Sequence, residues 1–399
     1  MTASITYFPV DNGDMTLVQL ADPDSTSILV DVKIRKAAEN PDDKARDVAK
    51  DLRDLLKKDK DGRPYVDAFL NSHPDDDHIL GFEKQFYAGP LSEYPDDDKP
   101  YSERRIVVRE LWCSLIVYRR ASKTHKLDKD AKAFNKEARR RIDVCREKGC
   151  KGIPEGDRVL VFGEDDESKG LDGILVKVDA KFTKVNAKDI SSYFTGTVLG
   201  PLSAKDEAED ELLGKNNSSV MLNMSISADS KSPGACRFLT GGDAEVEVWQ
   251  RLWAKHQKNL DVLRYDILLA PHHCSWRSMS NESWGDARKQ GRKASVNEHA
   301  LNALSQALEG AYIVASSKEI KNDDDDPPCW GAKLEYEKII NDKCVKGSFF
   351  CTAEHPNKTS PAPLTFNITA DGPVELIKKG SDAKNAGVSQ AARTPHPHG

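Results

Sequence analysis

The stretch YVDAFLNSHPDDDH (residues 65–78) joins a strand pattern directly to a cluster of side chains of the kind that bind metals. Residues 65–70 are mainly aromatic and aliphatic, which predicts a buried strand that ends at Asn71. Imidazole nitrogens and carboxylate oxygens together suit Zn, Mn or Fe. A loop held by a rigid strand is a common place for reactive groups. We therefore predict a metal site on His73, Asp75, Asp77 and His78.

The segments around this stretch predict an α/β protein with layered sheets. Residues 4–32 contain three strand-like runs separated by Asp-Asn-Gly-Asp and Asp-Pro-Asp turns, which is typical of paired strands. Residues 41–60 place apolar side chains at helical spacing, and residues 127–148 do the same, with Gly149 as the expected C-cap. The order strand, strand, helix, strand favours the α/β class.

Two later strands also end at polar clusters. CRFL is followed by TGGDAE (residues 240–245), and DILL is followed by APHHCS (residues 270–275). The glycines before Asp243 carry no Cβ, so the backbone there can approach a metal closely. The second cluster contains the pair His272 and His273. Either cluster alone would be an ordinary turn, but three such strand ends in one chain strengthen the prediction of a metal site.

In this order, the clusters resemble the pattern of the metallo-β-lactamase superfamily: HxHxDH, then a strand-end Asp, then a late His. The match is closer to the branch of the hydrolase domain of the DNA-uptake protein ComEC, which has HxDxDH, as residues 73–78 do. VDNGD (residues 10–14) resembles that branch's VGxGD turn, and NNSSVML (residues 216–222) resembles its NNxSLVL. LTGGDAE and APHHCS are similar to its LLTGDAE and PHHGS. The resemblance covers roughly residues 4–370.

The resemblance implies a four-layer αββα sandwich and a dinuclear site with two divalent ions, zinc or manganese. Carried over residue by residue, one ion would be bound by His73 and Asp75. The other would be bound by Asp77, His78 and one histidine of the 272–273 pair, for which we favour His273 over His272, and Asp243 would bridge the two ions.

The same resemblance implies a hydrolase that works through a metal-activated hydroxide. Asp77 would orient that hydroxide, and His272 would orient His273, contact substrate or assist the leaving group. The matched motifs also suggest that Asn217, Ser218 and Ser275 contact the substrate.

Three positions depart from the family pattern. Cys274 stands where the branch has Gly, and we expect a packing change rather than a ligand. The middle histidine of other branches has no clear counterpart between residues 79 and 242, since we expect His125 to lie at the surface. The acidic run at residues 322–327 replaces a late His-Pro. We expect this run to be a solvated loop, and the alternative is that one of its carboxylates substitutes for the histidine.

Charge is distributed unevenly along the chain. The net charge is −6, but residues 101–151 hold 16 Lys or Arg against 7 Asp or Glu, which is +9 locally and leaves −15 elsewhere. The resemblance to the ComEC branch implies a phosphodiesterase or nuclease that acts on DNA, and this basic segment could neutralise the phosphates. The contacts would come from the basic face of the helix, at Lys132, Lys136, Arg139 and Arg140.

Other functions remain open at this point. A small phosphodiester or cyclic nucleotide would need a closed pocket rather than a groove. A carboxylic ester, lactone or β-lactam is a further candidate substrate. The chain could instead be a partner-gated module with little activity, whose basic segment docks a protein, and the same charges could simply solvate an exposed helix.

The resemblance implies a single hydrolase domain over residues 1–378, with the basic segment as an insertion at about residues 84–158, and we expect the protein to be cytoplasmic. Residues 379–399 are low in apolar side chains and are expected to be a disordered tail. No apolar run is long enough to cross a membrane, and the N-terminus does not look like a signal peptide. The eight cysteines include no CxxC pair and are expected to be mostly reduced thiols.

Overall fold

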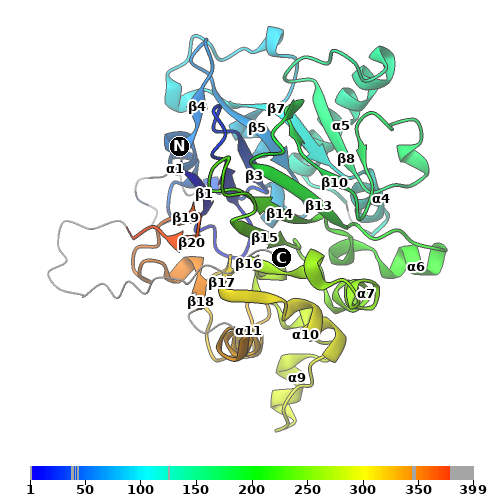
Figure 1. The fold of residues 1–399 in the computed structure, drawn as a ribbon, viewed down its shortest axis with the longest axis vertical. Helices are drawn as coiled ribbons and strands as arrows, with labels where there is room; N and C mark the ends of the chain where they lie inside the picture. Colours follow the sequence, from blue (N-terminus) through cyan, green and yellow to red (C-terminus); the bar gives the residue numbers. More distant parts are fainter. Residues whose placement is uncertain are drawn as a thin grey trace, which may run out of the picture.

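Two large sheets form the centre of the protein (Figure 1). The structure is a computed structural model that describes residues 2–36, 40, 42, 45–124, 126–343 and 347–377. Within these residues the first sheet has 11 strands, and its main path is β20 (Gly372–Glu375), β19 (Leu364–Thr369), β1 (Ala3–Tyr7), β2 (Thr16–Gln19), β3 (Ser27–Val30), β5 (Pro64–Leu70), β7 (Ile106–Cys113), β8 (Arg158–Phe162) and β9 (Leu175–Val176). Two short strands join its side, β4 (Lys57–Lys58) beside β5 and β6 (Phe86–Tyr87) beside β7.

The second sheet has 7 strands among the described residues. Their order is β10 (Lys181–Phe182), β13 (Phe194–Gly200), β14 (Met221–Ile226), β15 (Cys236–Thr240), β16 (Tyr265–Leu269), β17 (Ala307–Ala315) and β18 (Ser348–Cys351). A separate hairpin pairs β11 (Lys184–Val185) with β12 (Lys188–Asp189). Strands β3, β5, β7 and β8 run parallel in the first sheet, and β15, β16, β17 and β18 run parallel in the second.

Helices lie along the outer faces of both sheets (Figure 1). In chain order they are α1 (Val48–Leu55), α2 (Asp76–Ile79), α3 (Phe82–Gln85), α4 (Leu115–Thr124), α5 (Lys129–Lys148), α6 (Glu207–Leu212), α7 (Val246–His256), α8 (Pro271–Cys274), α9 (Trp284–Lys289), α10 (Glu298–Leu304) and α11 (Trp330–Lys343). None of these helices combines the length and the apolar character needed to cross a bilayer.

Alternation of side chains along the strands builds the layers. On β5, Ala68 and Leu70 join the core between the sheets, while Phe69 faces the core that includes α1 and α5. On β16, Leu268 points the opposite way from its neighbours, into the core that includes α7, α10 and α11. A strand directs successive side chains to opposite faces, so each sheet is covered on both sides. The expected four-layer αββα sandwich is confirmed.

Several predicted elements have different bounds in the structure. The predicted helix at residues 41–60 is only α1 in the part of the chain that is described, because Lys57 and Lys58 pair with β5 as a strand. The run ERRIVVRELWCSLIVY (residues 103–118) is typical of a strand or buried core, and the structure forms strand β7 before Ser114 and helix α4 after it. The spacing in HALNALSQALEG (residues 299–310) predicts a helix, but α10 ends at Leu304 and β17 begins at Ala307.

The basic segment is built into the sandwich. Strand β7 pairs with β5 on one side and β8 on the other, and α5 packs on the outer face of the same sheet. Asp128 caps the first turn of α5, and Gly149 ends it in the left-handed conformation, as expected. Arg141 is fully buried beneath the helix, where it pairs with Glu137 and donates to backbone carbonyls of β7 and β8.

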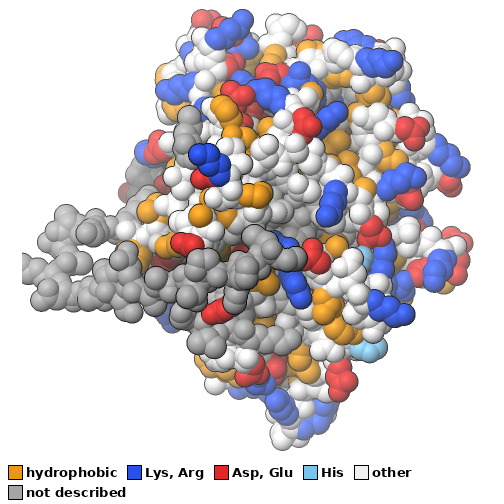
Figure 2. All heavy atoms as spheres, in the orientation of Figure 1, with side chains coloured by type: hydrophobic (Ala, Val, Ile, Leu, Met, Phe, Trp, Pro, Cys, Tyr) orange, Lys and Arg blue, Asp and Glu red, His pale blue; other side chains and the backbone are white. Residues whose placement is uncertain are grey.

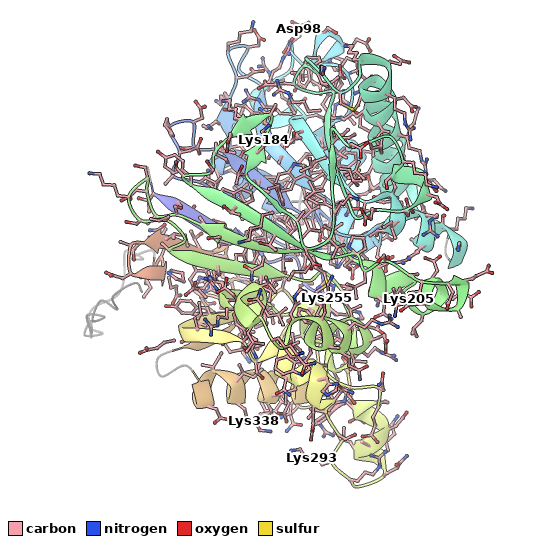
Figure 3. The ribbon with its side chains drawn as sticks, turned by 45° about the vertical axis from the view of Figure 1, so that its right-hand side comes forward. Asp98, Lys184, Lys205, Lys255, Lys293 and Lys338 are labelled. Carbon is pink, nitrogen blue, oxygen red and sulfur yellow. A yellow bond between two sulfur atoms is a disulfide. The ribbon has the colours of Figure 1, made fainter. Side chains whose placement is uncertain are left out.

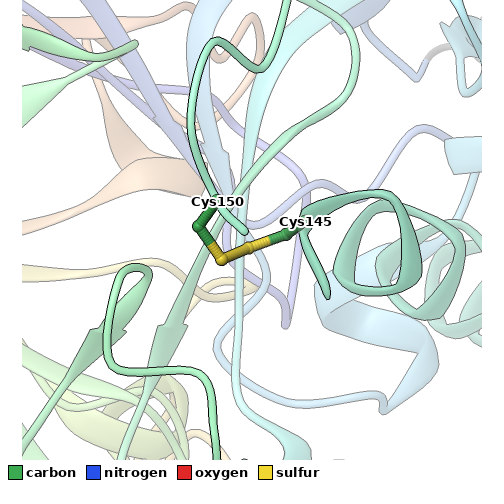
Figure 4. Close-up of a disulfide and its surroundings, with 2 residues drawn as sticks. All are labelled: Cys145 and Cys150. Carbon is green, nitrogen blue, oxygen red and sulfur yellow. A yellow bond between two sulfur atoms is a disulfide. The ribbon is translucent and has the colours of Figure 1, made fainter. Parts of the chain in front are cut away.

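Two of the cysteines expected to be reduced form a disulfide. Cys145, in the last turn of α5, is bonded to Cys150 just beyond it (Figure 4). The prediction was wrong for this pair because the left-handed turn at Gly149 folds the chain back and brings the two Cα atoms to 4.3 Å. The other cysteines that the structure describes are free and buried. The expected tail, His125 and Cys344 lie outside the described residues.

The buried pair of Arg141 and Glu137 gives a stability prediction. Arg141→Ala leaves the Glu137 carboxylate buried with less compensation, so the free energy of unfolding should fall by about 3–5 kcal/mol. Arg139→Ala, on the exposed side of the same helix, should change it by no more than about 0.5 kcal/mol. Urea unfolding of both variants measures the difference. Equal stability of the two would show that Arg141 does not tie α5 to the sheet.

Candidate metal centre

Four loops converge at the carboxyl ends of strands from both sheets. The loops follow β3, β5, β15 and β16, and they carry Asp31, the residues 73–78, Asp243 and the pair His272–His273. Open α/β sheets bind ligands in this position because the carboxyl ends of parallel strands present their loops together. The chain therefore brings the three clusters predicted from sequence to one place.

Close backbone approaches hold these loops together. Gly242 has a left-handed φ of +50°, and a Cβ there would lie 2.8 Å from the Ser219 side chain. Gly13 lies against the backbone of Asp77, where an added Cβ would come within 2.7 Å of the carbonyl oxygen. Larger residues at either position would push the loops apart. The second glycine before Asp243 thus allows a close approach to Ser219, and the predicted close approach to a metal stays a prediction.

The carboxylate of Asp243 lies at the centre of the site. Its Oδ1 is 3.0 Å from Nε2 of His78 and 3.4 Å from Nε2 of His273. Asp77 places its Oδ2 3.3 Å from the same nitrogen of His273. These four residues are close enough together to hold one metal ion.

The other oxygen of Asp243 faces a second set of donors. Its Oδ2 is 3.5 Å from Nε2 of His73 and 3.6 Å from Nε2 of His272. Asp75 lies 3.9 Å from the His73 nitrogen. The two oxygens of one carboxylate therefore face different pairs of histidines.

Each histidine turns its other ring nitrogen outward to an oxygen. Nδ1 of His78 lies 2.9 Å from Asp31, and Nδ1 of His273 lies 3.5 Å from Asp14. Nδ1 of His73 is 3.1 Å from the Ser72 hydroxyl. Such outer partners fix the ring orientation in metal sites, where the ligating nitrogen is the one opposite.

Charge in the site is concentrated and buried. Burial by itself lowers the pKa of His273, but Asp243, Asp14 and Asp77 outweigh it and raise that pKa to about 10. Burial likewise lowers the pKa of His78, but Asp243 and Asp31 raise it well above its ordinary value. Burial raises the pKa of Asp243, and the surrounding histidines bring it well below its ordinary value. The buried carboxylates are thus stabilised by nearby positive charge, which a divalent cation can supply in place of protons on the histidines.

The donor set fits metal ions. Four-coordinate tetrahedral ligands at the usual zinc distances lie roughly 3.4 Å from one another, and the separations around Asp243 range from 3.0 to 3.9 Å. Nε2 of His73 and Oδ1 of Asp243 are buried without a hydrogen-bond partner. Nε2 of His78 and Nε2 of His273 face each other at 3.3 Å. One cation on each side of Asp243 would satisfy these atoms.

Sequence patterns did not single out Asp31 or the outer role of Asp14. Together with His78 they form a second group of donors close enough to hold a metal, although Asp31 also accepts from Asn71 and Ser72. Asp14 was visible only as part of the VDNGD turn. Asp31 follows the apolar run ILV, so a carboxylate directly after a predicted strand is the signal that could have found it.

The three residues suggested as substrate contacts are held within the chain. Asn217 donates to the carbonyl of Leu212, and Ser218 accepts from Arg120. Ser275 donates to Asp326 at 2.7 Å, which places one acid of the run at residues 322–327 beneath the His272–His273 loop. Their contact with substrate stays a prediction.

A neighbour in the NNSS motif faces the centre instead. Nδ2 of Asn216 lies 3.2 Å from Glu245 and 3.5 Å from Nε2 of His272.

Comparison with known proteins adds little. No family model matches the chain, and no curated protein does. One solved structure that it resembles is named "Putative metal-dependent hydrolase", from Parabacteroides distasonis, with 11% identity over 88% of this chain and 93% of that chain, at a TM-score of 0.35. At that TM-score and identity the likeness supports neither the fold nor the function, and both rest on the residues described above.

Cys274 gives a prediction about the ligand set. Its side chain is fully buried in the core that includes α7, α10 and α11, and it belongs to neither donor group among the described residues. Its φ of 68° suits glycine. Cys274→Gly should therefore keep its metal content, and its stability should change by no more than about 1 kcal/mol. Metal analysis and urea unfolding check this, and loss of one ion per chain would make the thiolate a ligand.

Proposed function

We propose that this chain is a metal-dependent hydrolase of the metallo-β-lactamase type, with two divalent ions, Zn or Mn, held on either side of Asp243. The observation that carries the proposal is that each oxygen of this one carboxylate faces its own pair of histidine nitrogens. Bound divalent ions lower the pKa of coordinated water and stabilise negative charge on a phosphoryl or carbonyl oxygen. The residues of the site would hold and orient those groups.

The site is most exposed at the 73–78 loop. The side chains of Asp75 and Asp77 are about one-third exposed, whereas those of His73, His78, His273 and Asp243 are almost completely buried. Substrate would thus approach from the side of the 73–78 loop. Asp77 would orient the attacking group there, because its partly exposed carboxylate lies 3.3 Å from Nε2 of His273.

Two adjoining cavities lie beside α5, and the first of them reaches Asp76 of this loop. This first cavity, of about 810 Å³, is lined by the basic side chains of Arg35, Lys36, Lys84 and Lys129 and by the acidic side chains of Asp76, Glu83, Asp128 and Asp130. The second, of about 640 Å³, shares Glu83 and Lys129 with the first and continues past Lys132, Lys136 and Arg140. From Lys129 to Arg140 the helix rises about 17 Å, the axial length of about five nucleotides of one DNA strand.

We therefore propose a phosphodiesterase or nuclease of the ComEC type that acts on DNA. An open groove favours an extended phosphodiester over a small one that needs a closed pocket. On the face shown in Figure 2, basic and acidic side chains are interspersed, so this face presents no uniform basic patch. The groove along α5 is lined by several basic side chains of this segment, among them Lys132 and Lys136.

The basic side chains of α5 that we propose as phosphate contacts differ in their exposure and in their ion pairs. Lys132, Lys136 and Arg139 are exposed, and Arg139 pairs with Glu167 at the surface. Arg140 is partly buried and binds Glu137 and Asp157. Lys132 and Lys136 are therefore the cleaner probes of DNA binding, because replacing Arg140 would also break these ion pairs.

Removing one site carboxylate tests the hydrolase directly. Asp77→Ala should reduce hydrolysis of DNA or of bis-p-nitrophenyl phosphate by more than about 100-fold, since even outer partners of metal ligands cost 10–100-fold. Chelation of native protein should have the same effect, and added Zn²⁺ or Mn²⁺ should reverse it. Asp98→Ala, at the exposed end of the molecule labelled in Figure 3, should remain active. Full activity of chelated Asp77→Ala protein would refute the proposal.

Charge reversal on α5 tests the substrate. Lys132→Glu with Lys136→Glu should weaken binding of all DNA sequences alike, because these side chains contact phosphates. The slope of log affinity against log salt should flatten by roughly 0.7–0.9 for each phosphate that the variant no longer neutralises. Lys289→Glu with Lys293→Glu, on and beside α9 at the other end of the molecule, is the matched control (Figures 1 and 3). Unchanged DNA affinity in the α5 variant would leave these lysines as a solvated face or a protein-docking surface.

A further inference from the structure

We infer that the two consecutive histidines bind different ions: His273 binds the ion held by Asp77 and His78, and His272 binds the ion held by His73 and Asp75. The inference rests on the proposed two-ion function. It assigns the ligand that the sequence leaves missing, since no histidine between residues 79 and 242 corresponds to the middle histidine of other branches.

The measured distances place His272 and His273 next to different oxygens of Asp243. Nε2 of His273 lies 3.4 Å from Oδ1, and Nε2 of His272 lies 3.6 Å from Oδ2. His73 approaches the same Oδ2 at 3.5 Å, so His272 and His73 are placed alike. With His272, each ion has two histidines, one aspartate of its own and a share of Asp243. Each ion would then have four protein donors, and the coordinated water that hydrolysis needs would be an additional ligand.

The backbone explains how neighbours in sequence reach opposite oxygens. His272, His273 and Cys274 have φ values of 51°, 54° and 68°, so the turn labelled α8 is left-handed at three successive residues. This conformation is unfavourable for residues with a Cβ and persists where the surrounding structure imposes it. The turn sets the two imidazole rings 77° apart, with centroids separated by 6.0 Å.

The outer side of His272 resembles that of the other site histidines. Its Nδ1 lies 3.7 Å from Glu245 and is buried without a hydrogen-bond partner. Carboxylates in that position orient metal-ligating histidines in many sites. Asp31 and Asp14 occupy the corresponding positions at His78 and His273. His272 thus shares the inward Nε2 and the outward carboxylate of its neighbours.

A role as a leaving-group acid fits the geometry less well. A group that delivers a proton to substrate would direct its nitrogen to the open side of the site. The His272 side chain is 12% exposed, and its Nε2 faces an Asp243 carboxylate that is 3% exposed. The proton-delivery role suggested by the sequence would require the ring to turn away from Asp243.

Metal content of paired variants tests the assignment. Asparagine tolerates left-handed φ, so His272→Asn should disturb the turn less than alanine. After reconstitution with excess Zn²⁺ or Mn²⁺ and removal of free metal, the native chain should hold about two ions and His272→Asn about one. His272→Asn with His73→Ala should still hold about one, because both ligands serve the same ion. His272→Asn with His78→Ala should hold almost none.

Two controls make the result decisive. His299→Ala, on the exposed surface of α10, should keep two ions. Near-ultraviolet circular dichroism should show native packing in every variant. A further test uses the Mn²⁺-loaded protein. The native chain should give the EPR spectrum of a coupled pair of ions, and His272→Asn should give the six-line spectrum of a single, uncoupled ion. Glu245→Gln, which leaves the turn unchanged, should weaken binding of one of the two ions by about 10–100-fold.

The outcomes separate this assignment from the hydrolase proposal. Two tightly held ions in His272→Asn would overturn the assignment and leave the hydrolase intact. A native chain that binds only one ion would also overturn it, and one that binds none would overturn both. The expected metal pattern in a chain that hydrolyses no substrate would support the assignment and refute the hydrolase.

Discussion

A single buried carboxylate, that of Asp243, faces four imidazole rings, and the rest of the site is arranged around this contact. A charged carboxylate taken out of water is costly unless it is paired. Here the compensation comes from histidines on two other loops, so the loops must meet for the charge to be tolerated. Ser219 supports the arrangement by accepting from the backbone N–H of Asp243. Gly242 allows the close approach that this bond requires.

The packing of the two sheets against each other fixes the relative positions of the loops that form the site. His73 and His78 follow a strand of the first sheet, whereas Asp243 and the His272–His273 pair follow strands of the second. The apolar core between the sheets, with residues such as Ala68 and Ile267, fixes the separation of those strands. A close-packed interior transmits small shifts, so substitutions deep in this core would act on the site through the loops.

Much of the site could be predicted from sequence because its residues stand directly after apolar strands. The donors at residues 73–78, Asp243 and the late histidine pair were all found in this way, and the structure brings them together. Asp31 and Asp14 were not assigned as outer partners, because their contacts with His78 and His273 cross between strands far apart in sequence. The division of the two late histidines depends on left-handed φ values that no residue pattern indicates.

Other failures have local causes. Arg141 directly follows the predicted phosphate contacts Arg139 and Arg140, yet it is buried, because the helix turns it toward the carbonyls of β7 and β8. The disulfide between Cys145 and Cys150 arises from the turn at Gly149. Disulfides are typical of oxidising compartments, whereas the sequence predicted mostly reduced thiols in a cytoplasmic protein.

The central claim is that Asp243 bridges two metal ions. A crystal structure of the metal-loaded protein, with anomalous data collected at the absorption edge of the bound metal, tests it most directly. The account predicts two anomalous peaks, each about 2 Å from a different oxygen of Asp243. A single peak, or a peak located instead among Asp14, Asp31 and His78, would contradict it.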